Sequence, residues 1–256
     1  MDKLFKIDFN SGFKRTEHHN IVREEAFFLK GIINQTDAIC LEAIKQNGNA
    51  IEYVQNQTEA LCLEAVKQNA WSLQYVNNQT DVMCLEAIEQ NSKVLQYVKN
   101  QTEAICLEAV KKNSHVLKYV RNQTDAICLA AIRQYGGSLQ YVKNLTETFC
   151  LKAVRQNSEV LKYLKNQTEA ICLEAVKKNG KALRYVENQT EAICLEAVKK
   201  NGKALRYVKN QTDSICVVAV KQNKKSIVFI KYPSLFLICE IIKLDQIGRA
   251  SCRERV

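Results

Sequence analysis

The sequence is poor in the residues that interrupt a fold, because among 256 residues it has one proline and eight glycines. No stretch rich in Pro, Gly or Ser marks a linker, so composition gives no division into separate domains. Long apolar runs are also missing. The stretch Ile227–Ile242 is broken by Lys231, Pro233 and Glu240, whereas a bilayer-spanning helix needs about 20 apolar residues. The N-terminal residues alternate charged and apolar side chains and lack the apolar core of a signal peptide. We therefore expect a soluble, monomeric protein of a reducing cytoplasm, with no membrane contact.

Histidine is scarce as well, and the sequence has only His18, His19 and His115. Neighbouring residues on a helix point about 100° apart, so His18 and His19 are poor co-ligands for one ion. The cysteines lack the C-x₂₋₄-C spacing that is typical of zinc sites. We predict no metal site and no cofactor.

Cysteine, in contrast, is plentiful, with eleven residues. Nine of them recur every 22 residues, at Cys40, Cys62, Cys84, Cys106, Cys128, Cys150, Cys172, Cys194 and Cys216. Equivalent residues of stacked helical layers lie about 9–10 Å apart, which is beyond the ~7 Å limit on the Cα separation of a disulfide. Free cysteine packs as a small, buried hydrophobic residue. We interpret this column as core packing.

The same period governs the whole chain. The unit NQTDAICLEAIKQNGNAIEYVQ at Asn34–Gln55 recurs without insertion or deletion, giving nine tandem repeats in residues 34–231. The copies Asn166–Glu187 and Asn188–Lys209 differ only in their last residue. Self-similarity at a fixed period of this size is the signature of a repeat architecture.

The two ends of the chain depart from the pattern. Residues 1–33 are predicted to form an N-terminal cap that contains a degenerate repeat, since a solenoid needs a polar outer face at its end. Residues 232–246 keep part of the pattern and are interpreted as a truncated tenth repeat. The last ten residues, IGRASCRERV at 247–256, resemble the in-frame translation of a common sequencing adapter. We expect this tail to be non-native and give it no functional weight.

The residue pattern within each repeat predicts two short helices. Thr at the third position, as in Thr168, precedes an acid and an apolar run, so it is placed to cap a first helix. The Asn179-Gly180 step is predicted to stop that helix with the glycine in the left-handed conformation. The segment KALRYVE then forms a second helix, short enough to be partly 3₁₀, that turns Leu183 and Val186 inward. CLEAVKK favours a helix over the strand of a leucine-rich horseshoe, so we predict an all-α solenoid.

Units such as NQTEAICLEAVKKNGKALRYVE resemble the tandem repeats catalogued as domain of unknown function 4116. Such repeats occur in long arrays in giant DNA viruses and some bacteria. The resemblance covers residues 34–231 and implies a helical repeat in a viral or intracellular-bacterial setting, which for a virus means the host cytoplasm. The family is itself uncharacterised, so the resemblance names no activity.

The sequence offers no catalytic constellation. Near-copies present the same capping and packing residues in every repeat, and single Asn-Gly steps do not form a phosphate-binding loop. The NQT triplets match a glycosylation sequon, but we interpret their Thr as helix caps. We therefore predict that the protein is not an enzyme.

The leading hypothesis is a scaffold for an unknown protein partner. Positions after the first helix vary between copies while the apolar columns hardly change, which suits recognition on a fixed frame. The runner-up is nucleic-acid binding by Lys and Arg interleaved with a Tyr column, although helix dipoles and solvation explain much of that basic pattern. A spacer without a partner, or drift of a surface under weak selection, would leave the same pattern. The candidate partner-binding residues are Trp71, Lys93, His115, Lys181, Arg184, Lys203, Arg206, Tyr185 and Tyr207.

Overall fold

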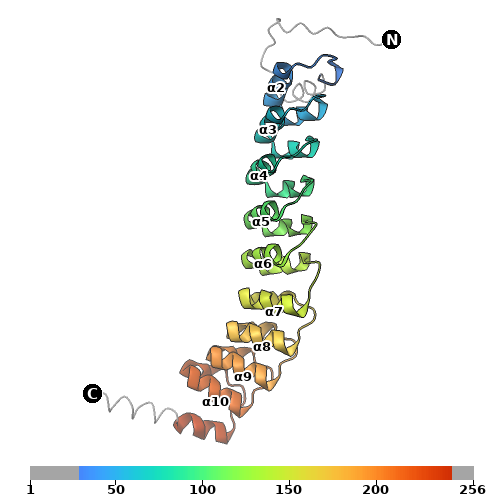
Figure 1. Ribbon diagram of the computed structural model, residues 1–256. Coiled ribbons are helices and arrows are strands. Elements are labelled where there is room, and N and C mark those ends of the chain that lie inside the picture. Colours follow the sequence, from blue (N-terminus) through green and yellow to red (C-terminus); the bar gives the residue numbers. More distant parts are fainter. Residues whose placement is uncertain (1–28, 244–256) are drawn as a thin grey trace, which may run out of the picture. The chain divides into compact units, whose positions relative to one another are not determined.

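The computed structural model describes residues 29–243. It divides into two compact units, Met1–Ala109 and Val110–Val256, with the boundary inside α5, and each unit is considered by itself. Of the cap expected at residues 1–33, residues 1–28, with His18 and His19, lie outside the described residues, as does the expected tail at 247–256. Within the described range every regular element is helical, and the predicted all-α class is confirmed (Figure 1).

Each repeat consists of a ten-residue α-helix and a six-residue 3₁₀ helix, labelled η. The predicted pair of short helices is confirmed, and the second is 3₁₀ throughout. A short 3₁₀ turn, η1, at Leu29–Gly31, precedes the regular series. The α-helices are α2 (Asp37–Gln46), α3 (Glu59–Gln68), α4 (Asp81–Gln90), α5 (Glu103–Lys112), α6 (Asp125–Gln134), α7 (Glu147–Gln156), α8 (Glu169–Lys178), α9 (Glu191–Lys200) and α10 (Asp213–Gln222). The 3₁₀ helices are η2 (Gly48–Tyr53), η3 (Ala70–Tyr75), η4 (Ser92–Tyr97), η5 (Ser114–Tyr119), η6 (Gly136–Tyr141), η7 (Ser158–Tyr163), η8 (Gly180–Tyr185), η9 (Gly202–Tyr207) and η10 (Lys224–Phe229). Residues 235–243 form one more helix.

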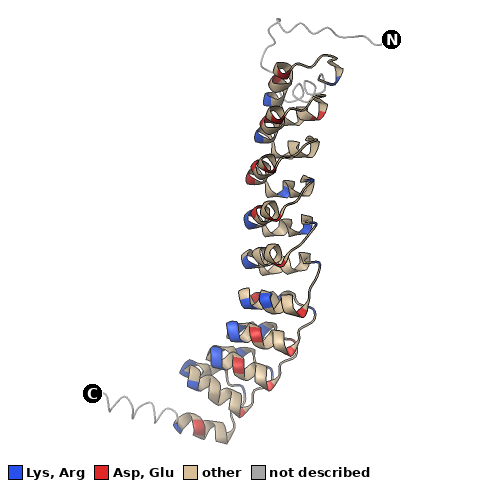
Figure 2. Ribbon diagram, in the orientation of Figure 1, with Lys and Arg blue, Asp and Glu red and all other residues tan. Residues whose placement is uncertain are grey.

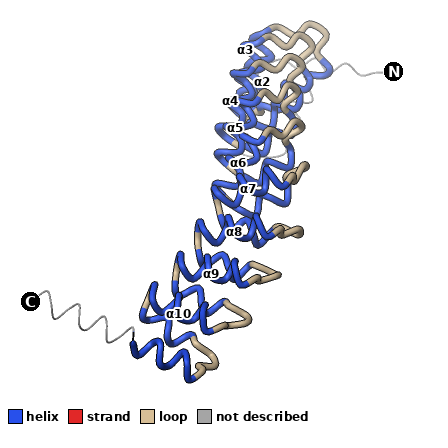
Figure 3. The backbone as a smooth tube through the Cα atoms, turned by 60° about the horizontal axis from the view of Figure 1, so that its bottom comes forward, coloured by secondary structure: helices blue, strands red, loops and turns tan. Residues whose placement is uncertain are grey.

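The elements stack in chain order. Within the second unit α8 packs on α7 and α9, and η8 packs on η7 and η9. The loops that lead from each η segment to the next α-helix lie along one edge of their unit (Figure 3). Repeats packed consecutively on their neighbours make a solenoid, in which no repeat buries its apolar face alone.

The buried columns are those that the periodicity predicts. In the repeat that contains α8 and η8, the side chains of Ile171, Cys172, Val176, Leu183 and Val186 are at most 3% exposed. The alanines in the middle of α3–α10 are equally buried, as are Ala50, Ala182 and Ala204 in the η segments of three repeats. Small residues there let the α and η layers approach closely.

Thr begins each α-helix, as predicted. The Thr168 hydroxyl accepts a hydrogen bond from the Ile171 amide at 3.4 Å and so satisfies an amide of the first turn. The same hydroxyl donates to Glu147 of the preceding repeat at 2.7 Å. One side chain therefore caps its own helix and joins it to the previous one.

The predicted left-handed glycine is wrong. No glycine of the described range has a positive φ. Asn179 ends α8 in an extended conformation (φ −148°, ψ 108°), and its side chain accepts from the Lys181 amide at 3.1 Å to cap η8. A Cβ at Gly180 would lie 2.4 Å from the Ala197 carbonyl oxygen of the next repeat, so a side chain there would require the neighbouring backbone to shift. Alanine or serine fills the equivalent buried position in four other repeats and the exposed Lys224 fills it in η10, so the position does not require a left-handed residue.

A glutamine bridge, which the sequence analysis did not predict, joins neighbouring repeats. The Gln189 side-chain amide donates to the carbonyls of Leu183 (3.3 Å) and Tyr207 (3.0 Å), and its oxygen accepts from the Lys209 amide at 2.9 Å. It therefore connects η8, η9 and the loop that follows η9. The Gln of most NQT triplets makes the same bonds, whereas Leu145 replaces it once and is 49% exposed.

One buried hydroxyl offers a test of the packing. Ser138 Oγ is fully buried and has no hydrogen-bond partner, whereas the equivalent Ser72 Oγ donates to Asn49 Oδ1 at 3.0 Å. Burying an unpaired hydroxyl is costly. We expect Ser138→Ala to raise the free energy of unfolding by about 1 kcal/mol and Ser72→Ala to lower it by about as much. Urea denaturation followed by circular dichroism measures both, and equal losses in the two variants would contradict the assignment.

Candidate functional site: the outer face of the 3₁₀ helices

The variable residues of each repeat lie on the 3₁₀ helices. A 3₁₀ helix has three residues per turn, so residues three apart lie on the same side. The second and fifth residues of the η segments therefore form a row in each unit, and we call these positions together the outer η face. Except for the buried Gly137, these side chains are exposed or half-buried. In order they are Asn49, Glu52, Trp71, Gln74, Lys93, Gln96, His115, Lys118, Gly137, Gln140, Glu159, Lys162, Lys181, Arg184, Lys203, Arg206, Lys225 and Val228.

A column of aromatic residues borders this face. The last residue of each η segment is half-buried: Tyr53, Tyr75, Tyr97, Tyr119, Tyr141, Tyr163, Tyr185, Tyr207 and Phe229. Cations lie over several of these rings. The Arg184 guanidinium is 4.4 Å from the Tyr185 ring centre, and Lys118 is 4.8 Å from that of Tyr119. The predicted interleaving of basic and aromatic side chains is therefore present.

Side chains of the outer η face contact neighbouring repeats. Trp71 is half-buried and meets Tyr97 edge-on, with 5.9 Å between ring centres. Arg184 pairs with Glu159 of the preceding η segment at 3.5 Å. Arg206 lies between two rings, 5.1 Å from Tyr207 and 5.7 Å from Phe229. These contacts make the outer face of each unit continuous from repeat to repeat.

The predicted site residues fall into two groups. Trp71 and Lys93 belong to the first unit, where Lys93 is exposed. The others belong to the second unit, with His115, the two lysines and the two arginines exposed and both tyrosines half-buried. All of them lie on the outer η face or in the Tyr column beside it.

Charge is unequal along the outer face. Segments η2–η4 contain one basic residue, Lys93, and one acidic residue, Glu52. Segments η5–η10 contain eight basic residues and a single acid, Glu159. Further lysines and arginines collect at the C-terminal ends of the α-helices, as α8 and α9 show (Figure 2).

An aromatic stack, which the sequence analysis missed, interrupts the pattern at η6. Tyr135 takes the place of the Asn that caps the η segment elsewhere, and it makes no side-chain cap bond. Its ring lies over Gly137, where a Cβ would come within 2.3 Å of it. The ring stacks on His115 with centres 5.4 Å apart and planes at 17°, and it meets Tyr163 edge-on at 6.2 Å. The sequence signal for this stack was the replacement of Asn by Tyr at the residue that precedes η6.

Hydrogen bonding completes this stack. The Tyr163 hydroxyl donates to the Tyr135 hydroxyl at 3.3 Å, and this bond is the main reason that the pKa of Tyr163 is raised. The Tyr141 ring also meets His115, with 6.1 Å between the ring centres and the planes tilted by 59°. Four rings from three consecutive repeats therefore meet on the outer η face.

The family comparison covers the neighbouring repeats. The profile of the family described as Domain of unknown function (DUF4116) matches residues 148–191 and 168–212. Residues 148–212 carry DUF4116 repeats. The predicted resemblance is confirmed for this stretch, which contains α8, η8 and α9. No curated protein and no solved structure matches the chain.

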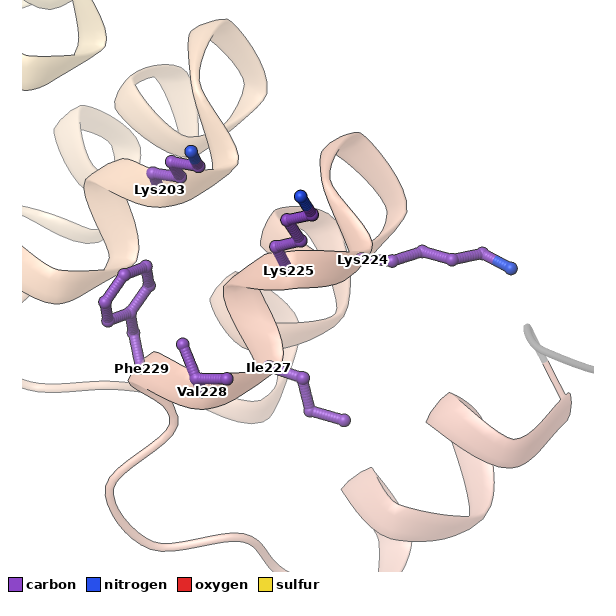
Figure 4. Close-up of a pocket in the computed structure, with 6 residues that line it drawn as sticks. All are labelled: Lys203, Lys224, Lys225, Ile227, Val228 and Phe229. Carbon is purple, nitrogen blue, oxygen red and sulfur yellow. The ribbon is translucent and has the colours of Figure 1, made fainter.

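A shallow hollow lies between η9 and η10 (Figure 4). Lys203 and Lys225 stand on the same side of the two segments, and Ile227 is directed away from them. The hollow is lined by Lys203, Lys224, Lys225, Ile227, Val228 and Phe229. Apolar and cationic side chains therefore adjoin one another in this hollow.

The thiols of the DUF4116 repeats are part of the core. Cys172 is 2% exposed, and its Sγ lies 3.7 Å from the Gln167 side-chain oxygen. Burial, with a smaller contribution from the negative charge of Glu169, raises the pKa of Cys172 to about 11. Because the thiolate is the reactive form, this thiol is a poor nucleophile at neutral pH. The interpretation of the cysteine column as core packing is confirmed, and all nine cysteines are free and buried.

The raised thiol pKa predicts a loss of stability at alkaline pH. The Cys172 thiol ionises near its ordinary pKa of 9.0 in the unfolded chain and near about 11 in the folded one. Its contribution to stability is therefore complete below about pH 9 and is lost as the pH rises through about 11, by up to about 1.4 kcal/mol per pH unit. We expect Cys172→Ala to be less stable than the parent at neutral pH but to lose stability less steeply above pH 9. Urea denaturation across this pH range measures the slope, and an unchanged slope would refute the assignment.

In the described part of the chain, no helix combines the length and apolar character that crossing a membrane requires. The same residues contain no group of three His, Cys, Asp or Glu side chains placed to hold a metal ion.

Proposed function

We propose that the protein is a non-catalytic scaffold that binds a protein partner through the outer η face. The observation that carries the proposal is the contrast between a constant frame and a variable face. Core columns repeat with little change, whereas the second positions of the η segments carry side chains as different as Trp71, Lys93, His115 and Glu159. Varied side chains on a rigid, repeating frame are how solenoids present binding surfaces.

The composition of the face supports this proposal. Tyr, Trp and Arg are the residues that contribute most to protein interfaces. In η8 and η9 the arginines Arg184 and Arg206 already lie against Tyr rings. Their side chains are thereby held in place, so less conformational entropy is lost on binding.

Nucleic-acid binding is the second candidate, and the charge of the second unit favours it. Seven basic residues against one acid at the outer positions of η5–η10 give this part of the face a positive field beside the aromatic column. A cationic track with stacking rings is typical of proteins that bind single strands. Segments η2–η4 lack this excess, so the two candidates predict different binding regions.

A pull-down from source-cell lysate, with and without nuclease and across a salt series, separates the candidates. The bait is the full chain. A protein partner resists nuclease and moderate salt, whereas phosphate binding falls linearly with log salt, by a slope of about −0.9 per duplex phosphate contact. The absence of any specific ligand under all conditions would overturn both proposals and favour a spacer.

A charge-matched pair of variants locates the surface. In the first variant Lys181, Arg184, Lys203 and Arg206 are changed to Gln. In the control the lysines at the ends of α8 and α9 are changed to Gln: Lys177, Lys178, Lys199 and Lys200. Both variants lose the same charge, but only the first alters the outer η face. We expect the first alone to weaken binding at least tenfold; equal losses would show that net charge, not this face, directs binding.

A further inference from the structure

The stack around Tyr135 is built at a cost to the fold. In other repeats an Asn at this position caps the η segment, as Asn157 caps η7 through a 3.0 Å bond from the Glu159 amide. Tyr135 keeps the same backbone conformation (φ −146°, ψ 113°) without that bond. Loss of a helix cap is destabilising, and local rules of this kind are most often broken at functional sites.

A second change accompanies the first. Gly137 lies where the other repeats have a side chain on the outer η face, and only glycine leaves room for the Tyr135 ring there. The ring therefore replaces the missing side chain and remains 43% exposed. The pair Tyr135 and Gly137 turns a position for one variable side chain into an aromatic platform.

Lysines flank this platform. Lys118 lies three residues from His115 in η5, so the two side chains are on the same side of that segment. Lys162 stands over the Tyr163 ring, with its nitrogen 5.6 Å from the ring centre. Glu159, the one acid of the surrounding η segments, is paired with Arg184. The charge around the exposed ring is therefore positive.

We propose that the stack of His115, Tyr135 and Tyr163 is a base-stacking platform for single-stranded nucleic acid. An exposed aromatic ring offers a face to any base, and Lys118 and Lys162 are placed to attract the phosphates that connect the bases. The positive surroundings favour this ligand over a basic or neutral peptide. The proposal rests on the second candidate function and names its central contact.

The consensus residue provides the test. Tyr135→Asn restores the cap, so this variant should be at least as stable as the parent, yet it removes the ring. Anisotropy of a fluorescently labelled oligothymidylate at low salt measures binding to the full chain. We expect Tyr135→Asn to weaken binding about tenfold, as the loss of one stacked base does, while its melting temperature rises. Tyr75→Phe, in η3 of the first unit and outside the basic segments η5–η10, should bind within about twofold of the parent.

The outcomes separate the platform from the wider surface. Salt-sensitive binding that Tyr135→Asn leaves unchanged would overturn the platform but keep the basic face as a nucleic-acid site. Parent protein that does not bind the oligonucleotide at low salt would overturn both. A protein partner that is lost from pull-downs with Tyr135→Asn, in the absence of oligonucleotide binding, would reassign the stack to a protein interface.

Discussion

A chain that lacks Asn188–Lys209 is expected to fold and unfold cooperatively, whereas a chain that lacks Asn188–Val198 is not. Removing the whole repeat joins Glu187 to Asn210. Because the deleted copy and its predecessor are almost identical, Gln211 then meets the same carbonyl of η8 that Gln189 meets in the parent. Every buried column stays in register across the new junction. The stability that is lost is therefore that of one repeat and of one interface between repeats.

The half-repeat deletion has a much larger effect. It removes the NQT triplet and most of α9, so η9 follows η8 without the α-helix that should cover both. The buried faces of η8, η9 and α10 then lack their partner. Far-UV circular dichroism and thermal melts compare the two chains. For the whole-repeat deletion, each 1 kcal/mol lost from the free energy of unfolding lowers the melting temperature by about 2–4 °C. The half-repeat chain, in contrast, should lose its cooperative unfolding transition. A sharp, native-like melt from the half-repeat chain would contradict this account.

Gln189→Leu is expected to lower the free energy of unfolding by about 3 kcal/mol, since it removes three hydrogen bonds to backbone groups at about 1 kcal/mol each. Those groups are the Leu183 and Tyr207 carbonyls and the Lys209 amide. A leucine of similar volume preserves apolar contact but cannot replace the bonds. Urea denaturation measures the difference in the free energy of unfolding between the variant and the parent.

Leu145 supplies the matched control, because the chain already carries this substitution at one junction. Leu145→Gln should restore the bridge between η6 and η7 and raise stability by a similar amount. The side chain of Leu145 is 49% exposed, so the change sacrifices little buried apolar surface. A stabilised Leu145→Gln together with an unaffected Gln189→Leu would show that exposure, not the bridge, sets the energies.

Much of the fold could be predicted from periodicity alone. The 22-residue period, the Thr caps and the buried columns depend on interactions within one repeat, and such interactions leave a local pattern. The glycine prediction failed for the opposite reason. The space available to Gly180 is limited by the Ala197 carbonyl of another repeat, and no local pattern reports that contact.

The candidate site was predictable only in part. The variable positions could be recognised by comparing copies, but their alignment into one row depends on the 3₁₀ geometry of the η segments, which the sequence suggested without establishing. Tyr135 was overlooked because it occupies a capping column and not a variable one. Its partner Gly137 resembles any other glycine until the ring that covers it is seen.

The reach of the glutamine bridge bears on how such a chain folds and evolves. Gln189 bonds a carbonyl 18 residues away, and this separation is the same however many repeats the array contains. Relative contact order therefore falls as the array lengthens, so added repeats should not slow the formation of the first folded segment. A duplicated repeat also inherits both the donor and the acceptor of its bridge, and recombination can extend the gene without compensating substitutions. The near-identity of Asn166–Glu187 and Asn188–Lys209 is the trace expected of such a step.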